Sequence, residues 1–173
     1  RIALFESLVA ESETNNKIRD EGMDLHDACQ PGHLIVCDLT DPLLSSLDVN
    51  GIFQVLVEQY RTLDLPRGCG RLLALDEAHK FMDGAATDGL SAAIVNIARL
   101  MRHDGIRLVV SSQSPLTLAP ELLELVTVAV LHRFHSKDWF SYLSKKLPLE
   151  AAAWDLLVSL SPGQALVFAS RHQ

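Results

Sequence analysis

The sequence predicts an α/β domain in which a mostly parallel sheet of about five strands is flanked by helices on both faces. Short apolar runs alternate along the chain with segments whose apolar residues recur at helical spacing, an order typical of this class. Polar or charged residues directly follow several of the runs, as they do at the carboxyl ends of strands in open α/β sheets.

The length indicates a single domain. With 173 residues, the chain is long enough for one full core and too short for two ordinary domains. We therefore expect residues 1–173 to form one domain, with residues 1–30 as a poorly defined lead-in and residues 31–173 as the core.

The composition excludes several classes of protein. With 48% apolar and 21% charged residues and no low-complexity tract, the chain is typical of a folded globular protein. No apolar run approaches the roughly 18 residues of a membrane span, and no signal peptide is visible, so we expect a soluble, intracellular protein of the cytoplasm or nucleus. Cys29, Cys37 and Cys69 are odd in number and lack CxxC spacing, which indicates reduced thiols rather than a disulfide framework or a zinc site.

The charge distribution limits the expected partners. The net charge is −7, and the chain has no basic footprint of the kind that binds nucleic acid. Contact with DNA would therefore use a few local basic residues or other regions of a larger protein. Because the chain begins with Arg1 rather than Met, we expect it to have been cut from something longer.

The first half of the chain is expected to supply two strands and one helix after the lead-in. The lead-in joins an apolar start, expected to be helical, to a polar and acidic stretch. Pro31-Gly32 then marks a turn, and the run after it ends in Asp38, while Asn50 is a possible N-cap. The predicted elements are a strand at 33–37, a helix at 51–63 and a strand at 72–75.

The second half alternates helices and strands in the same way. Gly105 is the expected C′ residue of the first helix, Pro115 and Pro120 bracket a turn, and Ser136 or Asp138 can cap a later helix. The predicted elements are a mobile loop at 84–89, a helix at 90–101, a strand at 107–110, a short helix at 122–125, a strand at 126–134, helices at 139–147 and 150–160, and a last strand at 165–169.

The strand at 72–75 carries the clearest functional signal. Its continuous apolar run is typical of a strand buried on both faces, and Asp76 and Glu77 follow it at once. At the carboxyl end of a core strand, an acid pair can hold a hydrated Mg²⁺ and orient a water molecule against a nucleotide phosphate. The same two residues can equally form a polar turn that caps the next helix.

Two later strands also end in polar side chains. Gln113 follows the strand at 107–110, and Arg133 stands at the end of the run at 126–134. If these strands are parallel, their ends lie along one edge of one sheet together with Asp76 and Glu77. The sequence therefore predicts a single site at that edge.

Five stretches, taken in order, resemble the RecA-like P-loop ATPases of the HerA and FtsK group, which includes the ATPases of type IV secretion. They are a strand ending in Asp-Leu (37–39), a Walker B box with a DEAH continuation (73–79), a strand ending in a polar sensor (109–113), a strand running into His-Arg (131–133) and a final Pro-Gly-Gln-Ala-Leu-Val-Phe strand (162–168). The resemblance covers the chain from about residue 31 to its end, and it implies a RecA-like P-loop NTPase core.

The resemblance also implies roles for the residues at the strand ends, with ATP and Mg²⁺ as cofactors. Asp76 would hold Mg²⁺ through a water molecule, Glu77 would orient the water that attacks the γ-phosphate, and Gln113 would sense that phosphate. Arg133 would resemble the arginine finger that a neighbouring subunit inserts, an effect worth ~10³ or more in rate. A contact of that kind implies a homo-oligomeric ring, which is hexameric in the family.

The chain departs from the family in one motif. A P-loop needs GxxxxGK[ST], and no glycine in this sequence is followed by lysine. The sequence therefore resembles the portion downstream of the Walker A motif, and the isolated chain is expected to be inactive as an ATPase. Without the P-loop strand, the sheet should either close the gap between the Gln113 strand and the Arg133 strand or leave two unpaired edges.

Three functions stay open at this point. The leading hypothesis is an ATP-hydrolysing motor domain of HerA/FtsK type that translocates DNA or protein. The alternative is a degenerate, non-hydrolysing domain that acts as an assembly or scaffold module. A third is a superfamily 2 helicase with Asp76 to His79 as its DEAH box, although Ser111-Ser112-Gln113 matches the expected Ser-Ala-Thr motif poorly.

Several single residues have simpler explanations. His79 can couple phosphate sensing to a partner or be an ordinary histidine on a helix face. His132 and His135 are three apart on a strand and face opposite sides, which disfavours a shared metal ion. Arg133 can pair with Asp138 within the domain, and Gln113 can simply bond strand-end backbone groups.

Overall fold

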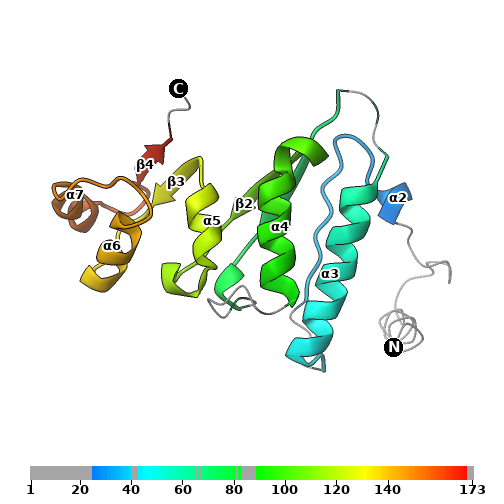
Figure 1. The fold of residues 1–173 in the computed structure, drawn as a ribbon, viewed down its shortest axis with the longest axis horizontal. Helices are drawn as coiled ribbons and strands as arrows, with labels where there is room; N and C mark the ends of the chain where they lie inside the picture. Colours follow the sequence, from blue (N-terminus) through cyan, green and yellow to red (C-terminus); the bar gives the residue numbers. More distant parts are fainter. Residues whose placement is uncertain are drawn as a thin grey trace.

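The computed structural model describes residues 25–39, 43–64, 66, 68–80, 82 and 89–170, so most of the expected lead-in and of the loop at 84–89 lies outside the described residues. Helices and strands alternate along the described part (Figure 1). The elements are α2 (Leu25–Ala28), α3 (Ser46–Thr62), β1 (Arg71–Leu75), η1 (Ala78–Lys80), α4 (Gly89–Asp104), β2 (Ile106–Val110), η2 (Pro115–Thr117), α5 (Pro120–Leu125), β3 (Val128–Leu131), α6 (Lys137–Ser144), α7 (Ala153–Ser159) and β4 (Leu166–Ala169). In this part, no helix is long and apolar enough to cross a membrane.

The strands form two separate pairs, so the prediction of one mostly parallel sheet of about five strands is wrong. β1 and β2 are parallel, with Leu73 opposite Leu108. β3 and β4 are antiparallel, because the chain passes through both α6 and α7 and turns at Gly163, whose φ is +83°, before it returns beside β3. β2 and β3 do not pair in the described structure. The sheet therefore does not close the gap between the Gln113 strand and the Arg133 strand, and the facing edges of β2 and β3 are unpaired among the described residues.

The predicted strand at 33–37 is also absent. The segment has no regular structure, and Leu34 and Val36 are 87% and 80% exposed. One cause lies at the outer edge of β1, where the Tyr60 hydroxyl of α3 donates to the Leu72 carbonyl over 3.2 Å. A carbonyl that a neighbouring strand would use is thus already bonded to a helix side chain. Asp38 therefore does not lie at a strand end.

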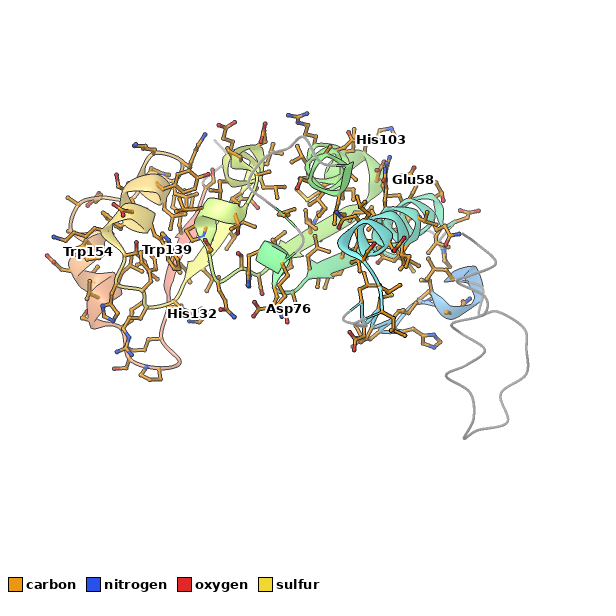
Figure 2. All side chains as sticks on the ribbon, turned by 90° about the horizontal axis from the view of Figure 1, so that it is seen from below. Glu58, Asp76, His103, His132, Trp139 and Trp154 are labelled. Atoms are coloured by element: carbon orange, nitrogen blue, oxygen red, sulfur yellow. The ribbon has the colours of Figure 1, made fainter. Side chains whose placement is uncertain are left out.

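In the described part of the chain, the helices cover one face of the β1–β2 sheet and not both faces as predicted. Ile106 is fully buried between the strands and α3 and α4, together with Val57 and Ile97. Figure 2 shows α4 and α5 on one side of these strands. Side chains on the other face remain open, since Leu72 and Val109 are 62% and 51% exposed.

Local capping signals agree with the sequence at two helix ends and differ at a third. Gly105 ends α4 with a φ of +64°, as predicted, and Ser136 caps α6 by accepting a hydrogen bond from Trp139 N over 3.3 Å. α3 begins earlier than predicted, because Ser45 rather than Asn50 is its N-cap and accepts from Asp48 N.

A polar cluster ties the start of β1 to the ends of α3 and α4. The Arg71 guanidinium donates to the Leu63 carbonyl and, over 2.8 Å, to the Asp104 carbonyl. The Asp104 carboxylate is bonded by Arg61 Nε over 2.9 Å and lies 3.1 Å from His103 Nδ1. These hydrogen bonds lower the pKa of Asp104, and the bond with His103 has the largest effect. The cluster therefore links the first residue of β1 to the ends of both helices.

Candidate functional site

The carboxyl ends of β1 and β2 lie together. Leu75 pairs with Val110, so the residues that follow each strand meet directly. The backbone pairing continues past the strands, since Ser111 N donates to Leu75 O over 2.8 Å and Ala78 N donates to Ser111 O over 2.9 Å. The acid pair and the polar loop after β2 are thus held at one sheet edge, as the sequence predicted.

Asp76 is fixed through one carboxylate oxygen. Its Oδ1 accepts from Ser111 Oγ over 2.5 Å and from Glu77 N over 3.0 Å. Within the described part of the chain, no hydrogen bond reaches Oδ2, and the residue is exposed. A carboxylate held on one side and open on the other fits a water-mediated Mg²⁺ ligand.

The phosphates of ATP have no comparable partner in these residues. The sequence has no GxxxxGK motif, so the 173 residues supply no Walker A cradle of backbone amides. The site therefore has groups suited to the metal and the attacking water, but the 173 residues supply no matching groups for the phosphates of ATP.

Glu77 has a strained backbone. Its φ is +53°, and no other non-glycine residue among those described has a positive φ. An L-residue in this left-handed region costs about 1–2 kcal/mol. Strain of this kind is found most often at functional sites, where the surrounding structure compensates for it.

The Glu77 carboxylate takes part in a three-residue cluster. Its Oε1 accepts from Gln113 Nε2 over 2.8 Å. Its Oε2 is buried and lies 3.2 Å from His79 Nδ1, and the same nitrogen lies 3.4 Å from Gln113 N. We call Glu77, His79 and Gln113 the carboxylate cluster. Two candidate residues from different strands, Glu77 and Gln113, are therefore in direct contact.

Ser111 is the site residue that the sequence analysis missed. In the sequence it belongs to the polar stretch Ser111-Ser112-Gln113 after β2, in which only Gln113 is a predicted site residue. The parallel register of the structure reveals it, because the residue after Val110 faces the residue after Leu75. Ser112 is bonded locally instead, accepting from Ser114 N over 3.2 Å.

Arg133 lies apart from these residues within the chain, so the prediction that its strand ends at the same sheet edge is wrong. It follows β3 in the second sheet and is exposed. Among the described residues, no hydrogen bond or ion pair joins it to Asp138 or to the carboxylate cluster. Figure 2 shows the preceding residue, His132, on the same side of the molecule as Asp76, and the His132 Nδ1 lies 3.2 Å from the Gln164 carbonyl oxygen.

Comparison with known proteins finds similarity at the level of structure. No protein-family model matches the chain, and no curated protein matches it. The crystal structure of B204, the DNA-packaging ATPase from Sulfolobus turreted icosahedral virus, is similar with a TM-score of 0.55 at 15% identity, over 96% of this chain and 83% of that one. The genome packaging NTPase B204 from Sulfolobus turreted icosahedral virus 2, in complex with AMP, has a TM-score of 0.50 at 17% identity over 76% of this chain.

These similarities establish a shared fold. The chain spans 59% of the length of the AMP-bound NTPase and 55% of the length of the complex with AMPPCP. At such low identity, the likeness shows that the chain shares the α/β fold of that viral protein and leaves its chemistry to be argued from the residues.

Proposed function

We propose that this chain is the ATP-hydrolysing motor domain of a HerA/FtsK-type ATPase, represented downstream of its Walker A segment, and that it drives translocation of DNA or protein. The observation that carries the proposal is the pair Asp76 and Glu77, each bonded through its carboxylate to a side chain that follows the neighbouring parallel strand. The fold shared with a viral DNA-packaging ATPase supports the same conclusion.

Each residue of the site has a proposed task. Asp76 holds Mg²⁺ through a water molecule with its free Oδ2, while Ser111 keeps the carboxylate in place. Glu77 orients the attacking water, and Gln113 links Glu77 to the γ-phosphate. Bound ATP would supply the phosphoryl group, and Mg²⁺ would neutralise the charge that develops on it.

The free edge of β2 offers a place for the missing strand. Ser111 N bonds to Leu75 O, so the backbone groups of Ser111 face β1 and those of Val110 and Leu108 face the opposite edge. That edge is unpaired in the described structure. A parallel strand added there would end beside Gln113, and the loop after it would reach the carboxylates.

The decisive variant is Glu77→Gln, measured in the chain joined to an upstream Walker A segment. Loss of the base should lower kcat for ATP hydrolysis by about 10² or more, because general-base catalysis contributes roughly 10²–10⁴. Glu58→Gln is the matched control, since Glu58 is exposed on α3 and its carboxylate bonds only Arg61 in the described structure. Hydrolysis at the wild-type rate by Glu77→Gln would exclude this mechanism.

The proposed ring can be tested through Arg133. If Arg133 acts on the site of a neighbouring subunit, Arg133→Ala should lower hydrolysis by about 10³. Mixing Arg133→Ala subunits with Glu77→Gln subunits should then restore part of the rate, because some subunit pairs combine an intact Glu77 with an intact Arg133. Two inactive variants that stay inactive when mixed would argue against a contact between subunits.

The second candidate is a non-hydrolysing scaffold module, which the lack of a GxxxxGK motif favours. A scaffold has no need for bound nucleotide, so it should show no Mg²⁺·ATP binding even when joined to its upstream segment. The ordered contacts of Asp76, Glu77 and Gln113 argue for the motor, because a site without chemistry does not require them.

A further inference from the structure

His79 is the member of the carboxylate cluster to which the proposed function gives no task. It lies in the short helix η1, which follows Glu77 directly. Its Nδ1 lies between two groups of opposite character, the acceptor Glu77 Oε2 at 3.2 Å and the donor Gln113 N at 3.4 Å. A neutral imidazole has one N–H, so Nδ1 can serve one of these groups at a time.

The two tautomers differ in what they leave unpaired. If the proton is on Nε2, Nδ1 accepts from Gln113 N, and no described residue donates a hydrogen bond to the buried Glu77 Oε2. Two lone pairs then face each other at 3.2 Å. If the proton is on Nδ1, Oε2 gains a donor, and the only bond lost is the long one from Gln113 N. A buried acceptor without a donor is the costlier loss, which favours the Nδ1–H form.

Among the residues that the structure describes, the surrounding charged groups provide no other donor for Oε2. Asp76 is turned to Ser111, and Lys80 is exposed, with its backbone N bonded to the Glu77 carbonyl. The donor that reaches the carboxylate from the other side is Gln113 Nε2, which bonds Oε1. His79 is therefore the group placed to satisfy Oε2.

We propose that His79 is a positioning residue whose Nδ1–H holds Glu77 Oε2, so that His79 and Gln113 together keep the carboxylate in a resting position. The inference rests on the proposed role of Glu77 in orienting water. In the resting position, each carboxylate oxygen accepts a hydrogen bond from the protein, which fixes the orientation of the carboxylate. Loss of the His79 bond frees Oε2 and lets Glu77 turn toward that water. Transfer of the proton to Nε2 releases Oε2 and lets Nδ1 accept from Gln113 N instead, which couples Glu77 to the residue proposed to contact the γ-phosphate.

The direct test is NMR of the ¹⁵N-histidine-labelled chain at pH about 8, above the usual titration range of histidine. Long-range ¹H–¹⁵N spectra distinguish a protonated from a bare Nδ1. His132 is an internal reference, because its Nδ1 faces the Gln164 carbonyl oxygen, which can only accept. We expect a protonated Nδ1 at both His79 and His132 in the wild type.

Glu77→Gln provides the paired measurement. Its amide can donate to Nδ1 where the carboxylate could only accept, so His79 should change to the Nε2–H form while His132 stays unchanged. Glu58→Gln should change neither signal. A bare Nδ1 at His79 in the wild type, or a His79 signal that Glu77→Gln leaves unchanged, would overturn the inference.

Hydrolysis gives an independent readout in the chain joined to a Walker A segment. His79→Ala should raise kcat, by up to about tenfold for the loss of one hydrogen bond, with KM unchanged. His79→Asn, which keeps an N–H near the place of Nδ1, should return kcat to the wild-type value. The NMR and hydrolysis experiments separate the possible failures. The expected NMR result without nucleotide binding would refute the ATPase function and would still support the contact between His79 and Glu77. Hydrolysis that depends on Glu77, together with a bare Nδ1 at His79, would refute the positioning role alone.

Discussion

Glycine at position 77 is expected to give a more stable protein than alanine does. Both substitutions remove the carboxylate and its contacts with His79 and Gln113, so they differ only in the backbone. The φ of +53° costs an L-residue about 1–2 kcal/mol, and glycine relieves it. Glycine also increases the entropy of the unfolded chain, which costs about 0.4–1 kcal/mol. The difference should leave Glu77→Gly more stable than Glu77→Ala by about 1 kcal/mol.

The assay is thermal and urea unfolding of the two variants side by side. For a domain of this size, 1 kcal/mol corresponds to about 2–4 °C in Tm. Glu58 supplies a control with the opposite sign, because it lies inside the α3 helix and is exposed. At this helix position, the Glu58→Gly variant should be less stable than the Glu58→Ala variant by about 1 kcal/mol. If Glu77→Gly is no more stable than Glu77→Ala, the strain at Glu77 is not present in solution.

Further substitutions test the packing and the polar contacts around the site. Asp104→Asn should lower the free energy of unfolding at pH 7 by about 1 kcal/mol or more, since it weakens the bond from Arg61. The pKa of Asp104 is lowered in the folded protein, so this stabilisation is present above the unfolded pKa of about 4, and the difference from wild type in urea unfolding should shrink as the pH falls below it. Ser111→Ala should weaken the affinity of the Walker A-joined chain for Mg²⁺·ATP in calorimetry, because Asp76 loses a hydrogen bond that orients it. Ile106→Ala should cost about 2–5 kcal/mol in chemical denaturation, since Ile106 is fully buried.

The features predictable from the sequence were those that depend on neighbouring residues. The apolar run before Asp76 became β1, Gly105 ended α4, and Ser136 capped α6. The meeting of Glu77 with Gln113 was also predictable, because parallel neighbouring strands bring their carboxyl ends to one edge. In each case the information lay in a short pattern and one topological rule.

The features that could not be predicted depend on contacts between distant segments. Residues 33–37 have the composition of a strand, but a strand exists only where an edge accepts it, and Tyr60 bonds a carbonyl at the outer edge of β1. The antiparallel β4 depends on how α6 and α7 turn the chain back. Residue spacing does not predict the left-handed backbone of Glu77. Nor does it predict that His79 lies between the Glu77 carboxylate and the Gln113 backbone N–H.

Calorimetric titration of Mg²⁺·ATP tests the central claim most directly. The samples are the 173-residue chain, the chain joined to an upstream Walker A segment, and the joined chain with Glu77→Gln. We predict no micromolar binding by the 173-residue chain, micromolar binding by both joined forms, and turnover of the bound ATP only where Glu77 is intact. Absence of binding by the joined chain, or equal turnover with and without Glu77, would contradict the assignment of this sheet edge as an ATPase site.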